Sequence, residues 1–184
     1  MIIGFTGPLG SGKEVAGEHL QKKGFTFYSL SDVMREELDK IGVEKTRQNI
    51  ISMGDEIRSK EGVGGLAKRI IKKIEQGKNY VIGSIRHPGE VEELRKTGRF
   101  FLVAIQADPK IRFERVKSRN REKDPRTFEE FMKVDRHDAD SKNEFSLQTA
   151  KCMEMADFVV TNEAGVKEFE KQLEALLEKV KENA

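Results

Sequence analysis

The sequence predicts an α/β fold of three layers, in which helices flank a five-stranded parallel sheet. Five short apolar runs recur along the chain and are interpreted as strands: Met1–Thr6, Phe25–Leu30, Tyr80–Ile85, Phe100–Ala107 and Phe158–Thr161. Continuous apolar runs of this length are typical of strands buried on both faces of a parallel sheet. Stretches rich in Lys and Glu separate the runs, and this alternation favours helices on both faces of the sheet.

Length and charge limit the alternatives. A chain of 184 residues suits one domain, because a single core of that size buries about 70% of the unfolded surface. The 34 Lys and Arg residues nearly balance the 32 Asp and Glu residues, so we expect no bulk binding of DNA, RNA or membranes. The lone Cys152 cannot form an internal disulfide, and the apolar start is too short for a signal peptide, so we expect a cytoplasmic protein.

The most specific motif follows the first predicted strand directly. It matches the pattern G-x-x-x-x-G-K of a phosphate loop, or P-loop, through Gly7, Pro8, Leu9, Gly10, Ser11, Gly12 and Lys13. The glycines let successive backbone N–H groups point at phosphate oxygens, the next helix adds partial positive charge, and the lysine reaches the outer phosphates. The motif therefore predicts a P-loop NTPase fold that binds ATP through these residues and the adjoining Glu14 and Val15.

A second group of polar residues follows the second predicted strand. Asp32 and Arg35 lie one helical turn apart at the start of a helix predicted over Val33–Ile41, with Ser31 or Asp32 as its cap. Ligands of open α/β sheets bind beyond the carboxyl ends of the strands, so we expect both side chains beside the P-loop. The alternative is a capping Asp with an ion pair on a solvated helix.

Arg86 follows the third predicted strand and should lie at the same edge of the sheet. With Lys13 and Arg35 it would form a group of three cations, as a second substrate with a phosphate group requires. His87 is interpreted as a loop residue rather than a base, because phosphoryl transfer relies on positioning and charge stabilisation.

The metal ligands depart from the usual pattern. Glu14 stands where Ser or Thr usually supplies a hydroxyl for Mg²⁺, and Val15 has no hydroxyl either. Glu14 could be a solvated acid, a carboxylate that reaches the metal, or a charge that lowers nucleotide affinity. No carboxylate of the Walker B type stands at Gly83 or Ser84, so Asp32 is the candidate that holds the metal through water.

Two long connections predict segments inserted between core elements. The connection over about 31–77 is long enough for two or three helices and predicts a helical substrate-binding insertion. Residues 119–143 are dense in Arg, Lys and Asp, so we expect an exposed and mobile lid. The core would then comprise 1–30, 78–118 and 156–184.

The chain leading into the lid carries several arginines at helical spacing. Those nearest one stripe are Arg112, Arg115 and Arg119, and they are followed by Arg121, Arg126 and Arg136. They would either face a phosphoryl group or form a solvated face. Asn162 ends the last strand and could contact a nucleotide base or cap the final helix. The apolar stripe of that helix, within Phe169–Val180, is expected to cover the sheet.

The order of these motifs resembles the P-loop nucleoside monophosphate kinases. The shared features are the P-loop, the D-x-x-R of Asp32–Arg35, an S-I-R-x-P-G-E-V-E segment from Ser84, the arginine-rich lid and an A-D-x-V-x-T-N segment ending at Asn162. They cover almost the whole chain. They are also similar to relatives of adenylate and dephospho-coenzyme A kinases and to the kinase-like segment of deoxycytidylate deaminases.

The resemblance implies transfer of the γ-phosphoryl group of ATP, with Mg²⁺, to a nucleoside or deoxynucleoside monophosphate bound by the insertion, in a monomer or homodimer. The resemblance implies that the catalytic residues are Lys13, Arg86, Arg115 and Arg119. It also implies that the acceptor is bound by Asp32, Arg35 and Arg86. A dephospho-coenzyme A kinase-like activity and a non-catalytic nucleotide sensor remain as alternatives. Glu14, Val15 and the missing Walker B acid favour the sensor.

Overall fold

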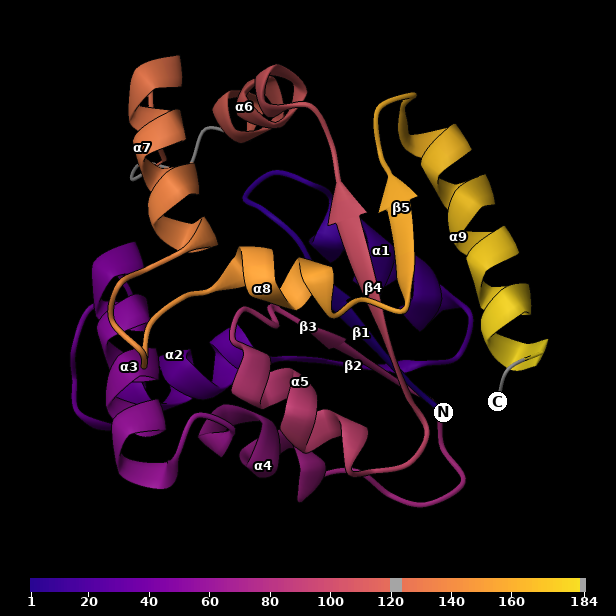
Figure 1. Cartoon of the computed structure of the whole chain (residues 1–184), viewed down its shortest axis with the longest axis horizontal. Coiled ribbons are helices and arrows are strands. Elements are labelled where there is room, and N and C mark those ends of the chain that lie inside the picture. The colour runs from indigo at the N-terminus through magenta and orange to yellow at the C-terminus, as the bar shows by residue number, and fades with distance from the viewer. Residues whose placement is uncertain (120–123, 183–184) are drawn as a thin grey trace.

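A parallel sheet of five strands forms the centre of the molecule, in the order β2-β3-β1-β4-β5 (Figure 1). The computed structural model describes residues 1–119 and 124–182. The strands are β1 (Ile2–Thr6), β2 (Thr26–Ser29), β3 (Tyr80–Gly83), β4 (Phe100–Gln106) and β5 (Phe158–Thr161). All four neighbouring pairs are parallel, which confirms the predicted α/β class and the buried parallel sheet.

Helices cover both faces of this sheet. In chain order they are α1 (Lys13–Lys22), α2 (Leu30–Lys40), α3 (Arg47–Glu61), α4 (Gly65–Ile71), α5 (Pro88–Arg95), α6 (Pro109–Ser118), α7 (Phe128–Ala139), α8 (Thr149–Glu154) and α9 (Val166–Glu182). No helix in the described ranges is long and apolar enough to cross a membrane.

Alternate residues of the strands supply two separate cores. Ile3 and Phe5 pack with α1 and α9 on one face, where the apolar stripe of α9 is buried as predicted. Ile2 and Ile82 pack with α2, α4 and α5 on the opposite face. Successive side chains of a strand point to opposite faces of the sheet, so each apolar strand contributes residues to both cores.

The predicted start of the second helix is wrong by three residues. The helix α2 begins at Leu30 because Ser29, and not Ser31 or Asp32, is its N-cap: the Ser29 hydroxyl accepts a hydrogen bond from Ser31 N. The third strand also ends earlier than predicted. Ser84 has φ = 61°, which takes the chain out of the extended conformation directly after Gly83.

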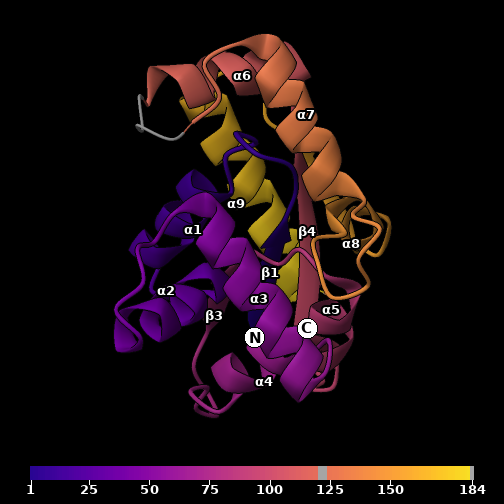
Figure 2. The same cartoon turned by 90° about the vertical axis from the view of Figure 1, so that its left-hand side faces the viewer.

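The expectation of an exposed lid is wrong for two residues of α7. Phe131 is fully buried in a small core with Leu9, Phe113 and Val116, and Asp138 is buried as well. This core attaches the P-loop residue Leu9 to α6 and α7, which lie together at one end of the molecule (Figure 2). Most of α7 outside this face is exposed, including Arg136.

Candidate functional site

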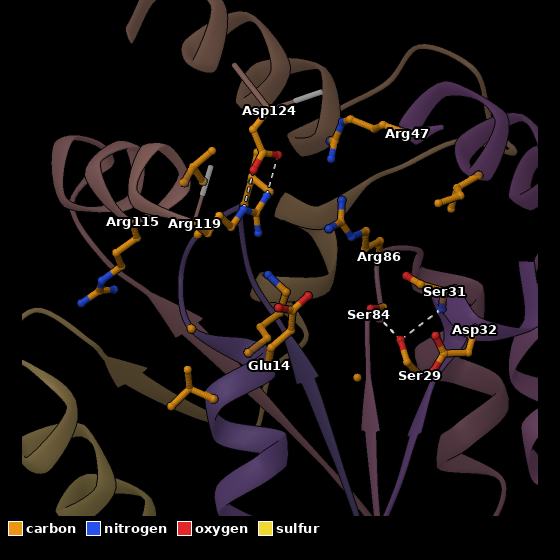
Figure 3. Close-up of a pocket in the computed structure, with 18 of the residues that line it drawn as sticks. Glu14, Ser29, Ser31, Asp32, Arg47, Ser84, Arg86, Arg115, Arg119 and Asp124 are labelled. Carbon is orange, nitrogen blue, oxygen red and sulfur yellow. Dashed lines mark hydrogen bonds and ion pairs between the residues drawn. The ribbon is translucent and has the colours of Figure 1, made fainter. Parts of the chain in front are cut away.

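A large cavity of about 1010 Å³ lies beyond the carboxyl ends of the strands. Its wall includes Gly12 and Lys13 of the P-loop together with Arg35 and Arg86. Glu14, directly after the P-loop, and Arg86 are both labelled in the close-up of this cavity (Figure 3). Figure 1 shows α6 and α7 beyond the arrowhead of β4, at this edge of the sheet. The predicted residues that line the cavity are Leu9, Gly10, Gly12, Lys13, Glu14, Val15, Asp32, Arg35, Arg86, Arg115, Arg119 and Asn162.

The P-loop backbone has a conformation that requires its glycines. Gly7, Gly10 and Gly12 have φ of 141°, 78° and 106°, and side chains rarely occupy this region. Space is also lacking, because a Cβ on Gly7 would stand 2.1 Å from the Ile105 carbonyl oxygen. On Gly12 it would stand 2.3 Å from Asn162 Nδ2. The loop therefore has the tight turn and helix start of a phosphate cradle.

Lys13 is held against the loop that it follows. Its Nζ donates to the carbonyl oxygens of Gly7 at 2.6 Å and Pro8 at 2.7 Å, and it lies 3.4 Å from Ser11 Oγ. Burial, together with the nearby Arg86 guanidinium, holds the pKa of Lys13 well below its usual value. An anion in the cavity would offset both effects, so the site favours a negatively charged ligand.

Asn162 joins the end of β5 to the P-loop. Its Nδ2 donates to the Ser11 carbonyl oxygen at 2.9 Å, and its main-chain and side-chain oxygens accept from Arg115 Nη2 at 3.0 and 3.2 Å. The alternative that Asn162 caps the final helix is wrong, because α9 begins four residues later at Val166. Arg115 Nη1 is buried without a hydrogen-bond partner in the described part of the chain, and it belongs to a cavity-lining side chain.

Three arginines from different elements also line the cavity: Arg35, Arg47 and Arg86. Arg35 pairs with Asp32 at 2.8 Å, and the two side chains are 41% and 57% exposed. The predicted ion pair on α2 is thus present, and both partners still line the cavity. Arg86 follows β3 and Arg47 begins α3. Figure 3 shows the side chains of Arg47 and Arg86 pointing toward one another.

A buried network holds the main chain around Arg86. Glu90 Oε2 accepts from the backbone N–H groups of Arg86 at 2.9 Å and His87 at 3.1 Å, while Glu90 Oε1 binds the buried Arg58. His87 Nδ1 accepts from Gly89 N at 3.1 Å and caps α5. These contacts give His87 a structural position, in line with its interpretation as a loop residue.

Arg112 of α6 and Arg119, which directly follows this helix, have carboxylate partners. Arg112 is buried, binds both oxygens of Asp135 at 2.6 and 2.8 Å and donates to the Leu9 carbonyl oxygen at 3.1 Å. It does not line the cavity. Arg119 lines it and binds both oxygens of Asp124 at 2.6 and 2.8 Å. Of the remaining predicted arginines, Arg126 and Arg136 are exposed, and Arg121 lies outside the described residues.

Three charged residues of this region belong to none of the motifs that predict the site: Arg47, Arg58 and Asp138. Each carries a signal that is visible in the sequence. Arg47 lies in the first turn of a helix, where the helix dipole disfavours a cation. Arg58 and Asp138 lie on the apolar stripes of their helices, Asp138 ten residues after Phe128 and seven after Phe131. Charged residues on a buried stripe indicate a paired or functional group.

Comparisons with known proteins agree with this arrangement. Residues 3–140 match a family model described as an AAA domain. A UPF0200 protein of Pyrococcus horikoshii is 33% identical over 190 residues, and the alignment covers 100% of this chain and 99% of that protein. The chain belongs to both of these families.

Solved structures with the same fold include two kinases. Shikimate kinase from Acinetobacter baumannii, in complex with shikimate, has a TM-score of 0.60 at 16% identity and covers 99% of this chain and 93% of its own. A gluconokinase from Sinorhizobium meliloti has a TM-score of 0.60 at 15% identity and covers 98% of this chain and 93% of its own. The UPF0200 chain thus has a P-loop kinase-like fold.

Proposed function

We propose that the protein is a phosphotransferase that moves the γ-phosphoryl group of ATP to a ribo- or deoxynucleoside monophosphate. The observation that carries this proposal is that one cavity is lined both by the P-loop and by the side chains of Arg35, Arg47 and Arg86. A protein that only binds ATP has little use for a second cluster of cations. Two anionic ligands in one cavity can instead meet in line for transfer.

The roles of the residues follow from their places in this cavity. Lys13 exchanges its contacts with the loop carbonyls for the outer phosphates of ATP. Arg86 holds the acceptor phosphate, and Arg35 joins it when it leaves Asp32. Arg115 and Arg119 neutralise charge that spreads over the phosphoryl group during transfer.

A magnesium ion would enter with ATP. Mg²⁺ usually takes one or two carboxylates, together with water and substrate phosphates, and the cavity wall offers Glu14 beside the P-loop and Asp32 across from it. This donor set fits the ion, and Asp32 would hold it through water. When bound, the ion supplies positive charge to the phosphate oxygens. We therefore propose ATP and Mg²⁺ as the cofactors.

Two other readings of the cavity need separate tests. The kinases with the same fold are named for acceptors that are not nucleotides. Shikimate and gluconate therefore join dephospho-coenzyme A among the alternative acceptors. A non-catalytic sensor is favoured by Ser84, which stands at the end of β3 where a Walker B acid is usual. A sensor would bind ATP and transfer nothing.

The test is ADP release from ATP and Mg²⁺ against a panel of ribo- and deoxynucleoside monophosphates, with shikimate, gluconate and dephospho-coenzyme A beside them. We expect ADP release that depends on one monophosphate and disappears in Lys13→Ala. Arg35→Gln should raise the acceptor KM and leave ATP binding, measured by calorimetry, within twofold of the wild type. ATP binding without acceptor-dependent release would contradict the proposal and favour the sensor.

A further inference from the structure

One buried carboxylate joins two of the arginines that line the cavity, Arg47 and Arg86. Asp138 Oδ2 accepts from Arg86 Nη1 at 2.8 Å and also binds Arg47 Nη2. The three residues come from distant parts of the chain: Arg86 follows β3, Arg47 begins α3 and Asp138 lies in the last turn of α7. The core, the insertion between β2 and β3, and the segment between β4 and β5 therefore meet at a single oxygen atom.

Asp138 lies behind the arginines and outside the cavity itself. Its side chain is 3% exposed and is absent from the cavity wall, whereas Arg47 and Arg86 both line the wall. Their side chains are 32% and 19% exposed. Each arginine gives one terminal nitrogen to Asp138, and a guanidinium group has further donors that can bind an anion.

Charge explains why the arginines need this carboxylate. Two guanidinium groups that point toward one another in a partly buried site repel, and the repulsion is screened less there than in open solvent. Burial opposes ionisation of Asp138, but the charges of Arg86 and Arg47 outweigh it and keep the pKa of the carboxyl below its usual value. The cluster therefore keeps a net positive charge while its two cations stay close together.

We infer that Asp138 is a positioning residue that fixes the spacing of Arg47 and Arg86 so that together they bind the anionic group of the acceptor. The inference rests on the proposed function and adds Arg47 to the acceptor-binding set. It also gives α7 a role before any ligand binds. A carboxylate on the opposite side of the arginines, inside the cavity, would instead compete with the acceptor.

The two arrangements predict opposite effects of Asp138→Asn. If Asp138 positions the arginines, the loss of its charge weakens acceptor binding about tenfold or more, which is the usual effect of losing one hydrogen bond to a charged group. If Asp138 competes with the acceptor, binding becomes tighter. Asp138→Glu keeps the charge and should recover part of the loss. Asp140→Asn removes an exposed acid two residues away and is the matched control.

Binding is measured by calorimetry with AMP, GMP, CMP and UMP and their deoxy forms, on protein saturated with a non-hydrolysable ATP analogue. In Asp138→Asn we expect weaker binding of the monophosphate and unchanged binding of the ATP analogue. The KM for the acceptor should rise by a larger factor than kcat falls. The effect should shrink to less than about twofold in an Arg47→Gln background, because coupled residues are not additive. Tighter, unchanged or additive binding would overturn the inference.

A second measurement needs no substrate and separates this inference from the proposed function. Phenylglyoxal modifies accessible guanidinium groups, and mass spectrometry follows Arg47 and Arg86 individually. We expect both to react several-fold faster in Asp138→Asn than in the wild type or Asp140→Asn. Equal rates would show that Asp138 does not hold the arginines. If modification is faster in Asp138→Asn but the wild type binds none of the monophosphates, the proposed function is contradicted, whereas the positioning role of Asp138 is not.

Discussion

Asn162 Nδ2 lies 2.9 Å from the Ser11 carbonyl oxygen and donates a hydrogen bond to it. This bond crosses from the end of β5 to the turn of the P-loop and is buried. The same amide leaves no room for a Cβ on Gly12. The shape of the phosphate cradle is therefore set by a residue 151 positions away in the sequence as well as by its own glycines.

Asn162→Asp tests this connection. Aspartate can still accept from Arg115 but cannot donate to Ser11, and its charge faces a carbonyl oxygen. We expect a loss of about 1–3 kcal/mol in the free energy of unfolding and weaker ATP binding by calorimetry. Gln106→Ala, which removes an exposed side chain at the neighbouring strand end, should change both by little. Unaltered ATP binding in Asn162→Asp would mean that the bond does not shape the loop.

Gly12→Ala separates backbone strain from steric clash. Gly12 and Gly24 have φ of 106° and 88°, but a Cβ on Gly24 meets nothing within 4 Å. Both alanine variants therefore incur backbone strain of roughly 1 kcal/mol, and only Gly12→Ala also displaces Asn162. Calorimetry should show ATP binding lost or weakened more than tenfold in Gly12→Ala and unchanged in Gly24→Ala. Equal ATP binding by the two variants would contradict a steric clash between the added Cβ and Asn162.

Phe131→Ala tests whether α7 is packed onto the P-loop or is a free lid. Phe131 is fully buried with Leu9 and Phe113, so its truncation should lower the free energy of unfolding by about 3–5 kcal/mol. Phe128 lies one turn earlier on the same helix and is 38% exposed, so Phe128→Ala should cost clearly less. Denaturant unfolding measures both. A small loss in Phe131→Ala would mean that α7 is detached in solution.

His87 should make stability depend on pH. Its Nδ1 accepts from Gly89 N and its Nε2 donates to the Glu144 carbonyl oxygen at 2.8 Å, which fits the neutral ring. Burial lowers the pKa of His87 in the folded protein, so the unfolded chain binds a proton more readily. Stability is then fully present above pH ~6.5, the ordinary value for the unfolded chain, and is lost as the pH falls below it.

Unfolding measured between pH 5 and 7.5 checks this dependence. We expect the wild type to lose free energy of unfolding toward pH 5 more steeply than His87→Gln. His137→Gln removes an exposed ring and should follow the wild type. Parallel curves for the wild type and His87→Gln would contradict a neutral buried His87.

Local patterns were enough to predict the sheet, the P-loop and the clustering of Lys13, Arg35 and Arg86 at one cavity, because the ends of parallel strands meet at one edge. Side-chain partners over long distances could not be predicted in this way. Asp138 lies within residues 119–143, whose density in Arg, Lys and Asp predicts an exposed lid. Its burial depends on Arg47 and Arg86, which lie 91 and 52 positions away in the sequence.

The start of α2 shows the same limit at short range. Ser29, Ser31 and Asp32 are all good caps, and the sequence does not rank them. Ser29 is selected because β2 ends there beside Ser84, whose hydroxyl lies 3.0 Å from the Ser29 hydroxyl. Pairing between strands therefore decides a helix boundary that propensity leaves open.

The most direct test of the proposed function is to follow the γ-phosphoryl group itself. The protein is incubated with Mg²⁺ and ATP labelled in that group, together with each nucleoside monophosphate, and the nucleotides are separated. We predict label in one nucleoside diphosphate, little in free phosphate, and none transferred by Lys13→Ala. Label that stays in ATP with every monophosphate, although ATP is bound, would contradict the account.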